Sequence, residues 1–145
     1  MAMAAPTEIR GIGANIGKKA LLYKNHDGIA ATATGDAIPV AGAKKITVEL
    51  VELATVLNRS GVLTITASVD NGVNFRAFAM LIDQVANTNA QTLTRVASKT
   101  RAAAGVDLLA VDIEKFGFTH IKSVVTITDG ATPSGTFNVN VLVQY

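Results

Sequence analysis

The segment TFNVNVLVQY, from Thr136 to Tyr145, alternates between two kinds of side chain. Every second residue belongs to an apolar set, which consists of Phe137, Val139, Val141, Val143 and Tyr145. A period of two places such a set on one side of a β-strand, whereas a helix would scatter it around its circumference. The segment therefore predicts a β-strand with one buried face.

Three runs upstream show the same alternation. They are KKITVEL (44–50), VLTITASV (62–69) and THIKSVVTIT (119–128), and in each the apolar side chains fall on one face. The residues DGATPSG, which are rich in turn formers, stand between the third run and the C-terminal strand. We therefore expect Thr119 to Tyr145 to form a β-hairpin with a longer loop.

Other segments predict shorter or more deeply buried strands. LLAVDI (108–113) and FRAFAMLI (75–82) are apolar enough to be covered on both faces. Short strands are expected at Ala20–Lys24 and Leu93–Ala97, although Gln84–Gly105 is more typical of an excursion loop, with a short helix as the alternative. About seven or eight strands joined by Gly-, Asn-, Asp- and Thr-rich loops predict an all-β, antiparallel β-sandwich of jelly-roll-like type.

Residues 1–19 stand apart from this pattern. They mix small residues and glycines with isolated isoleucines that follow no lasting period, so they cannot bury enough area to order themselves. Residues 1–24 also carry four basic side chains against Glu8, whereas the rest of the chain is nearly neutral. We expect two parts: an extended N-terminal arm, 1–19, that reaches onto a neighbour, and a β-sandwich domain, 20–145.

The composition of the chain excludes some classes of partner. Apolar residues make up 49% of the 145 residues and charged residues only 17%, which predicts surface reserved for other subunits. Aromatic residues are 5% and tryptophan is absent, so the stacking residues of a nucleic-acid interface are scarce. No apolar run approaches the ~20 residues of a membrane helix. We expect neither nucleic acid nor a membrane as a partner.

The segment SVDNGVNF, from Ser68 to Phe75, is the stretch that most resembles a site. A calcium loop of the EF-hand type needs a glutamate at its twelfth position, and counting from Asp70 this position is Leu81. Asp-Asn-Gly instead supplies residues that tolerate a positive φ where a strand reverses. The segment therefore predicts a turn and not a metal site.

The glycine-rich segment GIGANIGKK, from Gly11 to Lys19, imitates a phosphate-binding loop. The Walker pattern requires a glycine where this chain has Ile12, and a serine or threonine where it has Lys19. The dinucleotide-binding pattern fails as well, because its third glycine is misplaced and no strand is expected before the segment. We interpret it as part of the flexible arm.

The reactive side chains of the chain form no catalytic or metal-binding motif. His26 and His120 are the only histidines, and without further ligands in register we interpret them as loop and surface residues. The chain has no cysteine and no nucleophile elbow. Asp107, Asp112 and Glu114 are close in sequence, and Asp112 and Glu114 are expected on one face of a strand end, with their charges in water. We expect a protein that is not an enzyme and that holds no metal, cofactor or small-molecule substrate.

The order of these features resembles the head decoration, or cement, proteins of tailed bacteriophages. The similarity lies in a loose N-terminal arm, a hairpin of the form S-x-D-x-G-x-x-F at Ser68, Asp70, Gly72 and Phe75, and a terminal pair of strands. The similarity in the pattern of strands and turns covers Lys45 to Tyr145. The resemblance implies a homo-oligomer, expected to be a trimer, on the outer surface of the phage capsid, where it clamps neighbouring major capsid protein subunits.

A cement protein needs a rigid body, apolar faces and an extended segment that adds contact area, but it needs no reactive groups. The residues expected to contact the capsid or a neighbouring subunit are the apolar and basic side chains of the arm: Ile9, Arg10, Ile12, Ile16, Lys18 and Lys19. Two alternatives remain open. A phage tail or head–tail connector subunit would share the sandwich but form rings, and a carbohydrate-binding β-sandwich module would not need the arm.

Overall fold

The computed structural model describes residues 3–10, 19–78, 81–83, 95–96, 98–102 and 105–145. All regular structure in these residues is β, and every strand pairing is antiparallel. The strands are β1 (Thr7–Arg10), β2 (Lys19–Ile29), β3 (Ala33–Thr34), β4 (Ile38–Pro39), β5 (Lys45–Ser68), β6 (Arg76–Ala77), β7 (Leu81–Asp83), β8 (Arg95–Val96), β9 (Ser98–Arg101), β10 (Gly105–Asp112) and β11 (His120–Gln144). The prediction of an all-β, antiparallel protein is confirmed. The described residues include no helix of the length and apolar character that a membrane crossing requires.

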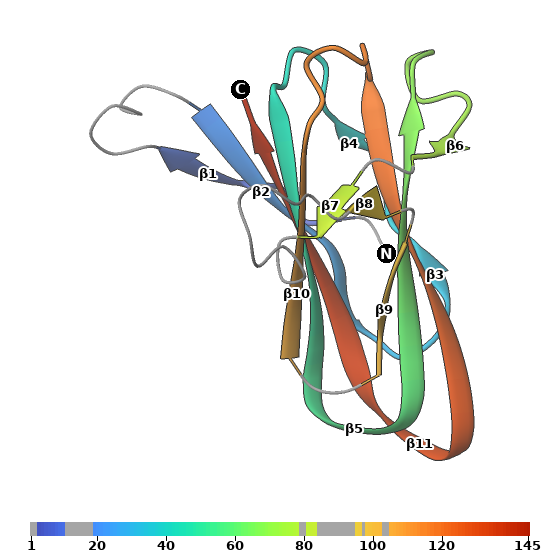
Figure 1. Cartoon of the computed structure of the whole chain (residues 1–145). Helices are drawn as coiled ribbons and strands as arrows, with labels where there is room; N and C mark the ends of the chain where they lie inside the picture. The colour runs from blue at the N-terminus through green and yellow to red at the C-terminus, as the bar shows by residue number, and fades with distance from the viewer. Residues whose placement is uncertain (1–2, 11–18, 79–80, 84–94, 97, 103–104) are drawn as a thin grey trace.

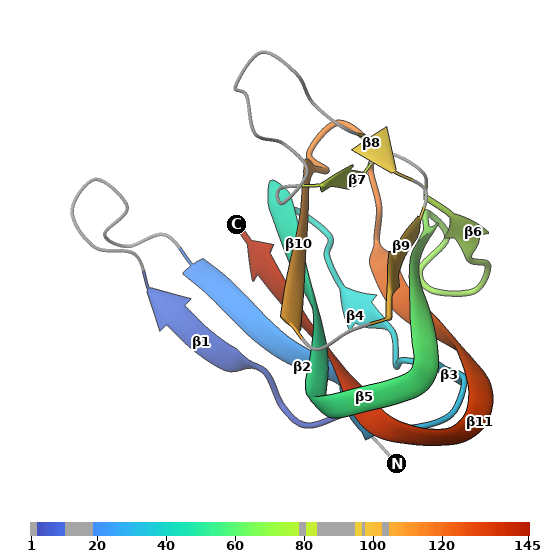
Figure 2. The ribbon, with the colours of Figure 1, turned by 60° about the horizontal axis from the view of Figure 1, so that its bottom comes forward.

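The two longest strands, β5 and β11, form a folded ribbon that organises the molecule. They pair from Lys45↔Gln144 at one end to Ser68↔His120 at the other, with irregular register around Asp129. Both strands bend sharply at that irregular point, at the bottom of Figure 1 and in front in Figure 2. The two halves of the ribbon therefore face each other as the two layers of a β-sandwich.

The other strands extend each half of the ribbon into a layer. In the first layer the order is β1-β2-β11-β5-β10-β7-β8, and it uses residues 136–144 of β11 and 45–53 of β5. In the second layer β3 and β4 pair with residues 120–125 of β11, while β6 and β9 pair with residues 61–67 of β5. Each long strand thus has neighbours on both sides in both layers.

The predicted hairpin from Thr119 to Tyr145 is wrong. Residues 120–144 form the single strand β11, and both of its halves pair with β5 rather than with each other. The runs 44–50 and 62–69 are likewise two halves of β5. The reason lies in DGATPSG, where Thr132 and Gly135 have positive φ values of 49° and 93°: these residues bend the strand without reversing it.

The core lies between the two layers, on the faces that the alternation predicts. The side chains with at most 1% exposure there include Ile46, Val48, Leu50, Leu63, Ile65, Ile121, Val125, Phe137, Val139, Val141 and Val143. Leu109, Ala110 and Val111 of β10 are buried in succession, as expected for a strand covered on both faces.

The predictions for residues 75–82 and 84–105 are confirmed only in part. FRAFAMLI (75–82) does not form one covered strand: it contains the exposed pair β6, a buried Phe78 and the start of β7. The strand predicted at Leu93–Ala97 contains β8. The proposed excursion, Gln84–Gly105, also contains the strand β9, and its first half, 84–94, lies outside the described residues.

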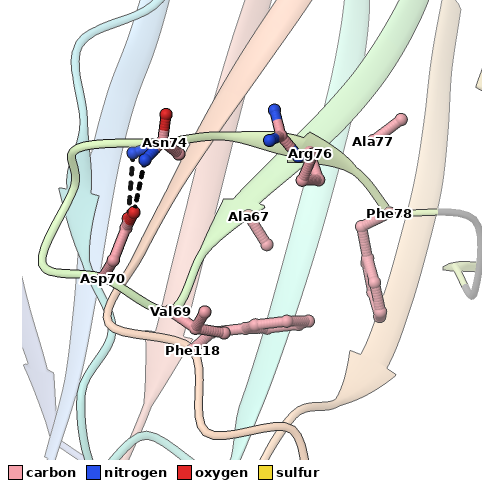
Figure 3. A pocket seen from close by; sticks show the side chains of 8 residues that line it. All are labelled: Ala67, Val69, Asp70, Asn74, Arg76, Ala77, Phe78 and Phe118. Carbon is pink, nitrogen blue, oxygen red and sulfur yellow. Dashed lines mark hydrogen bonds between the residues drawn. The ribbon is translucent and has the colours of Figure 1, made fainter.

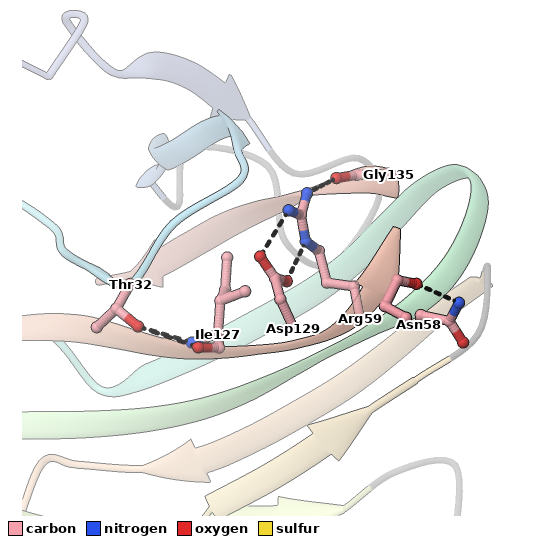
Figure 4. A network of polar contacts seen from close by, with 7 residues as sticks. Thr32, Asn58, Arg59, Ile127, Asp129 and Gly135 are labelled. Atoms are coloured by element: carbon pink, nitrogen blue, oxygen red, sulfur yellow. Dashed lines mark hydrogen bonds and ion pairs between the residues drawn. The ribbon is translucent and has the colours of Figure 1, made fainter. Parts of the chain in front are cut away.

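A polar network holds the bend of the ribbon (Figure 4). Arg59 of β5 makes a bidentate ion pair with Asp129 of β11, with Nε–Oδ1 and Nη2–Oδ2 distances of 2.6 and 2.9 Å, and its Nη1 donates to the carbonyl oxygen of Gly135. Asn58, whose φ is 53°, donates to the carbonyl oxygen of Ala131. The Arg59 hydrogen bonds hold the pKa of Asp129 below its usual range. The network joins the two strands where their regular pairing is interrupted.

His26 is buried, contrary to its interpretation as a loop histidine. In the pairing of β2 with β11, Val139 faces His26 and the next residue, Asn140, faces Lys24, so Asn25 is the extra residue of a β-bulge. The bulge leaves both Asn25 and His26 buried. Nε2 of His26 lies 3.2 Å from the carbonyl oxygen of Ser123 in the opposite layer. A local register shift, which periodicity does not reveal, therefore places a histidine in the interior.

We expect the stability of the protein to fall as the pH drops below the ordinary histidine pKa of 6.5. Burial lowers the pKa of His26, so the folded protein keeps it neutral while the unfolded chain binds a proton. Replacing His26 with glutamine should flatten this part of the stability profile, measured by urea unfolding between about pH 5 and pH 8. The exposed Lys24→Gln variant should keep the wild-type profile. An unchanged slope in His26→Gln would contradict the assignment.

Candidate functional site

The loop that joins β5 to β6 is closed by Asp70. Its Oδ1 accepts hydrogen bonds from Ser68 Oγ (2.6 Å) and from the backbone N–H of Asn74 (2.9 Å), while Oδ2 accepts one from Asn74 Nδ2 (2.6 Å). Asn71 and Gly72 have φ values of 60° and 82°. The Ser68 hydroxyl and the two Asn74 groups hold the pKa of Asp70 well below its usual range. The turn predicted for SVDNGVNF is confirmed, and its carboxylate serves the loop.

Three phenylalanines pack beside this loop. The rings of Phe116 and Phe118 stack with centroids 5.3 Å apart, and Phe78 meets both edge-on, at 5.3 and 5.0 Å. Phe78 follows β6, whereas Phe116 and Phe118 belong to the connection between β10 and β11. The rings therefore link two loops that lie far apart in the sequence.

A cavity of about 330 Å³ lies between the loop and the rings (Figure 3). It is lined by Ala67, Val69, Asp70, Asn74, Arg76, Ala77, Phe78 and Phe118. In this view the Asp70–Asn74 pair lies at the left and Phe78 at the right, while the Phe118 ring lies below Ala67. The cavity thus has an apolar wall of aromatic rings opposite a polar wall whose carboxylate is already hydrogen-bonded.

Large apolar side chains are exposed around this cavity. Val69 is 67% exposed, Val73 76% and Phe116 42%. We call Val69, Val73, Phe116 and the cavity lining the apolar end of the sandwich. Exposed apolar groups that gather at one place mark interaction surfaces, because leaving them in water is unfavourable. This surface was not predicted from the sequence, where its signal is the pair of valines, Val69 and Val73, within an otherwise polar turn.

The predicted contact residues of the arm lie elsewhere. Ile9 and Arg10 belong to β1, where they pair with Ala20 and Lys19 of β2 at the edge of the first layer, and Ile9 is 41% exposed. Lys19 begins β2 and is exposed. Figures 1 and 2 show β1 and β6 on opposite sides of the molecule. The structure therefore does not bring these residues to the apolar end.

The other three predicted contact residues, Ile12, Ile16 and Lys18, lie outside the described residues. The division into an arm, 1–19, and a body, 20–145, stays a prediction. One part of that segment differs from a loose arm: Thr7–Arg10 is hydrogen-bonded to the sheet. Its alternating Thr-Glu-Ile-Arg pattern is too short to predict a strand from periodicity alone.

A charged cluster lies between the layers, at the bent end of the ribbon. Nη1 of Arg101, at the end of β9, is 3.0 Å from Asp107 Oδ2, and its Nε is 4.0 Å from Glu52 Oε2. Both carboxylate side chains are almost completely buried. Gly105 has a φ of 141°, and a Cβ there would overlap Nη2 of Arg101. Asp107 is buried, whereas Asp112 and Glu114 are exposed, as expected.

A second cavity, of about 410 Å³, lies beside the Asn25 bulge. Met3 covers part of it: its backbone N–H donates to Asp36 Oδ2 (2.6 Å), and its Sδ accepts from Asn25 Nδ2 (3.3 Å). Across the described part of the chain, no three His, Asp or Glu side chains are grouped so that they could hold a metal ion. Met3, Asn25 and Asp36 of this cavity are hydrogen-bonded to each other, so the apolar end remains the better candidate for an interaction site.

Comparisons with known proteins place the fold. No family model matches the chain, and its sequence matches no curated protein. Among solved structures, the chain is similar to the SPBc2 prophage-derived protein YomS, with a TM-score of 0.61 and 16% identity over 93% of this chain and 100% of YomS. It is also similar to the PBSX exported protein XepA, with a TM-score of 0.59 and 19% identity over 89% of this chain. The match covers 39% of XepA, so this chain corresponds to a part of that protein.

A third similarity is weaker. The CBM22-1–GH10 modules of Clostridium thermocellum xylanase 10B, solved with xylohexaose, match with a TM-score of 0.42 and 10% identity, over 99% of this chain and 24% of the xylanase chain. That score is too low to support an argument about binding. The all-β chain described here therefore shares its fold with the prophage-derived protein YomS and with a part of the PBSX protein XepA.

Proposed function

We propose that this chain is a structural protein of a bacteriophage that binds the assembled head as an oligomer, expected to be a trimer. It acts on the outer surface of the capsid, holds neighbouring major capsid protein subunits together and catalyses no reaction. The fold shared with prophage-derived proteins supports the phage origin. The observation that carries the binding role is the apolar end, where Val69, Val73 and Phe116 are exposed on the two loops that border the cavity.

The physical basis of this role is mass action. A protein that binds the assembled lattice better than free subunits stabilises the lattice by an amount set by affinity and concentration. Contact energy at such surfaces is concentrated in a few large side chains that become fully buried. Val73 and Phe116 are suited to this, because both are held on loops fixed by the Asp70 hydrogen bonds and the phenylalanine stack. The rigid body thus presents apolar groups at little further entropic cost.

We expect the double variant Val73→Asp/Phe116→Asp to bind capsids at least about tenfold more weakly than the wild-type protein. Both side chains are exposed, so the variant should fold, which near-ultraviolet circular dichroism can check. The measurement is co-sedimentation with capsids of the encoding phage that lack this protein, together with the temperature at which those capsids open. Val106→Asp is the matched control, because Val106 is 46% exposed and lies on β10.

Other results would contradict the proposal. Wild-type protein that leaves capsids unbound but sediments with phage tails, or that forms hexamers by light scattering, would instead indicate a tail or connector subunit. A monomer that binds glycans on an array and ignores capsids would indicate a carbohydrate-binding module. The six arm residues remain a separate proposal, which deletion of residues 1–19 tests in the same capsid assay.

A further inference from the structure

The cavity of the apolar end has the size of a side-chain pocket. Its volume of about 330 Å³ corresponds to roughly ten water molecules at liquid density, which is room for one large apolar side chain and its backbone. Ala67, Ala77, Phe78 and Phe118 give it apolar walls. An aromatic or large aliphatic group that enters it would leave water and gain contacts with the rings.

The rim of the cavity offers hydrogen-bond donors but few acceptors. The oxygens of Asp70, the acidic group in the lining, already accept three hydrogen bonds from Ser68 and Asn74. The residue Arg76 is exposed, and among the described residues no hydrogen bond or ion pair is recorded for its side chain. Arg76 is the cation of the lining, and Asp70 is the anion, whose oxygens are already engaged within the loop. A carboxylate that reaches the rim would therefore pair with Arg76.

The strand beside the cavity lies at the edge of its layer. β6 consists of Arg76 and Ala77, which pair with Ala67 and Thr66 of β5. On the other side of β6, the described residues provide no paired strand. An extended peptide can add to such an edge through backbone hydrogen bonds, with alternate side chains entering adjacent pockets. The open side of β6 therefore lies beside the cavity, so an extended segment that pairs with β6 could place one of its side chains in the cavity.

We propose that the apolar end binds an extended, acidic segment of a partner protein, in which one large apolar side chain is flanked by carboxylates. The apolar side chain fills the cavity, a flanking carboxylate pairs with Arg76, and the backbone lies along β6. The identification of the partner rests on the proposed function, which makes the segment part of the capsid. The chemistry of the pocket does not depend on that identification and can be tested on the protein alone.

The test is a titration of the full chain, observed by backbone amide NMR, with three peptides. The probes are acetyl-Glu-Glu-Phe-Glu-Glu-amide, the same peptide with alanine for phenylalanine, and the same peptide with lysine for every glutamate. We expect the first to shift the amides of residues 67–78 and 118, and each of the others to bind at least about tenfold more weakly. Equal binding of the alanine or lysine peptide would overturn the proposal.

Variants of the protein sharpen the test. Arg76→Glu should reverse the preference between the acidic and the lysine peptide, because it inverts the charge at the rim. Ala77→Leu should abolish binding by filling the cavity, and Ala77 is exposed, so the fold should persist. Lys24→Glu makes the same change of charge at an exposed position outside the cavity and should bind like the wild type. Binding unaffected by Ala77→Leu would place the peptide elsewhere and refute the pocket.

The two proposals fail in different ways. If the peptides behave as expected but neither the wild-type protein nor Val73→Asp/Phe116→Asp binds capsids, the pocket stands and the head-binding role is wrong. If that double variant loses capsid binding while Arg76→Glu and Ala77→Leu retain it, the head-binding role stands and the pocket is wrong. Binding of xylo-oligosaccharides to the same amides, with no response to the acidic peptide, would overturn the peptide assignment.

Discussion

Replacing Arg101 with methionine should lower the free energy of unfolding by about 3 to 5 kcal/mol. Its guanidinium reaches from β9 in the second layer to Asp107 and Glu52 on adjacent strands of the first layer. Methionine retains most of the apolar stem but removes the cation that both carboxylates face. Two acidic groups with little solvent around them would then be left close together, and their mutual repulsion adds to the cost of keeping them buried.

The expected loss of stability in Arg101→Met arises from the two buried carboxylates, so a variant that lacks their charges is the control. In the triple variant Glu52→Gln/Asp107→Asn/Arg101→Met the buried charges are gone, and we expect a large part of the lost stability to return. Urea unfolding followed by circular dichroism measures all variants. A loss below about 1 kcal/mol in Arg101→Met would show that the cluster is not an electrostatic tie between the layers.

Gly35→Ala should destabilise the protein by about 2 to 4 kcal/mol, because it combines overpacking with the loss of a buried hydrogen-bond group. An added Cβ would overlap Oδ1 of Asn25 and lie 2.5 Å from its Cγ. Asn25 cannot move aside freely: its Oδ1 accepts from the backbone N–H and hydroxyl of Ser123, and its Nδ2 donates to the carbonyl oxygen of Asp36. The buried side-chain amide of Asn25 therefore fits only because Gly35 has no side chain and its backbone can lie close to the amide.

A double-mutant cycle isolates this cause. Asn25→Ala removes the atoms that the new methyl group would meet, so in that background Gly35→Ala should cost less than about 1 kcal/mol. The difference between the two backgrounds, from chemical unfolding, reports the steric conflict. Equal costs in both backgrounds would show that Gly35 is required for another reason, such as its backbone conformation.

The sequence predicts which side chains are inside far better than how the strands connect. Ile46, Leu63 and Val141 are buried because alternation fixes the face of a strand once one side is covered. The same alternation does not distinguish a strand that ends from one that bends. The glycines and proline of DGATPSG satisfy either geometry locally, and the choice is made by the pairing of both halves of β11 with β5.

The candidate site could be predicted only in part. The turn at Asp70 follows from local chemistry, since its carboxylate bonds to groups at most four residues away. The apolar end does not, because it joins Val73 to Phe116, and the residues between them contain several strands. The sequence signal for Phe116 is its place beside Phe118 in the short connection between β10 and β11, and nothing local indicates that it lies beside Phe78.

The central position of β11 has a consequence for how the protein is made. This strand lies between β2 and β5 in one layer and between β3, β4 and β5 in the other. A nascent chain that ends before residue 120 has no partner for the inner edge of either half of β5, so neither layer can close during translation. The apolar residues of β5 therefore stay exposed while about fifty further residues, up to the start of β11, leave the ribosome. A chaperone that binds unfolded chains would protect them from aggregation during this period.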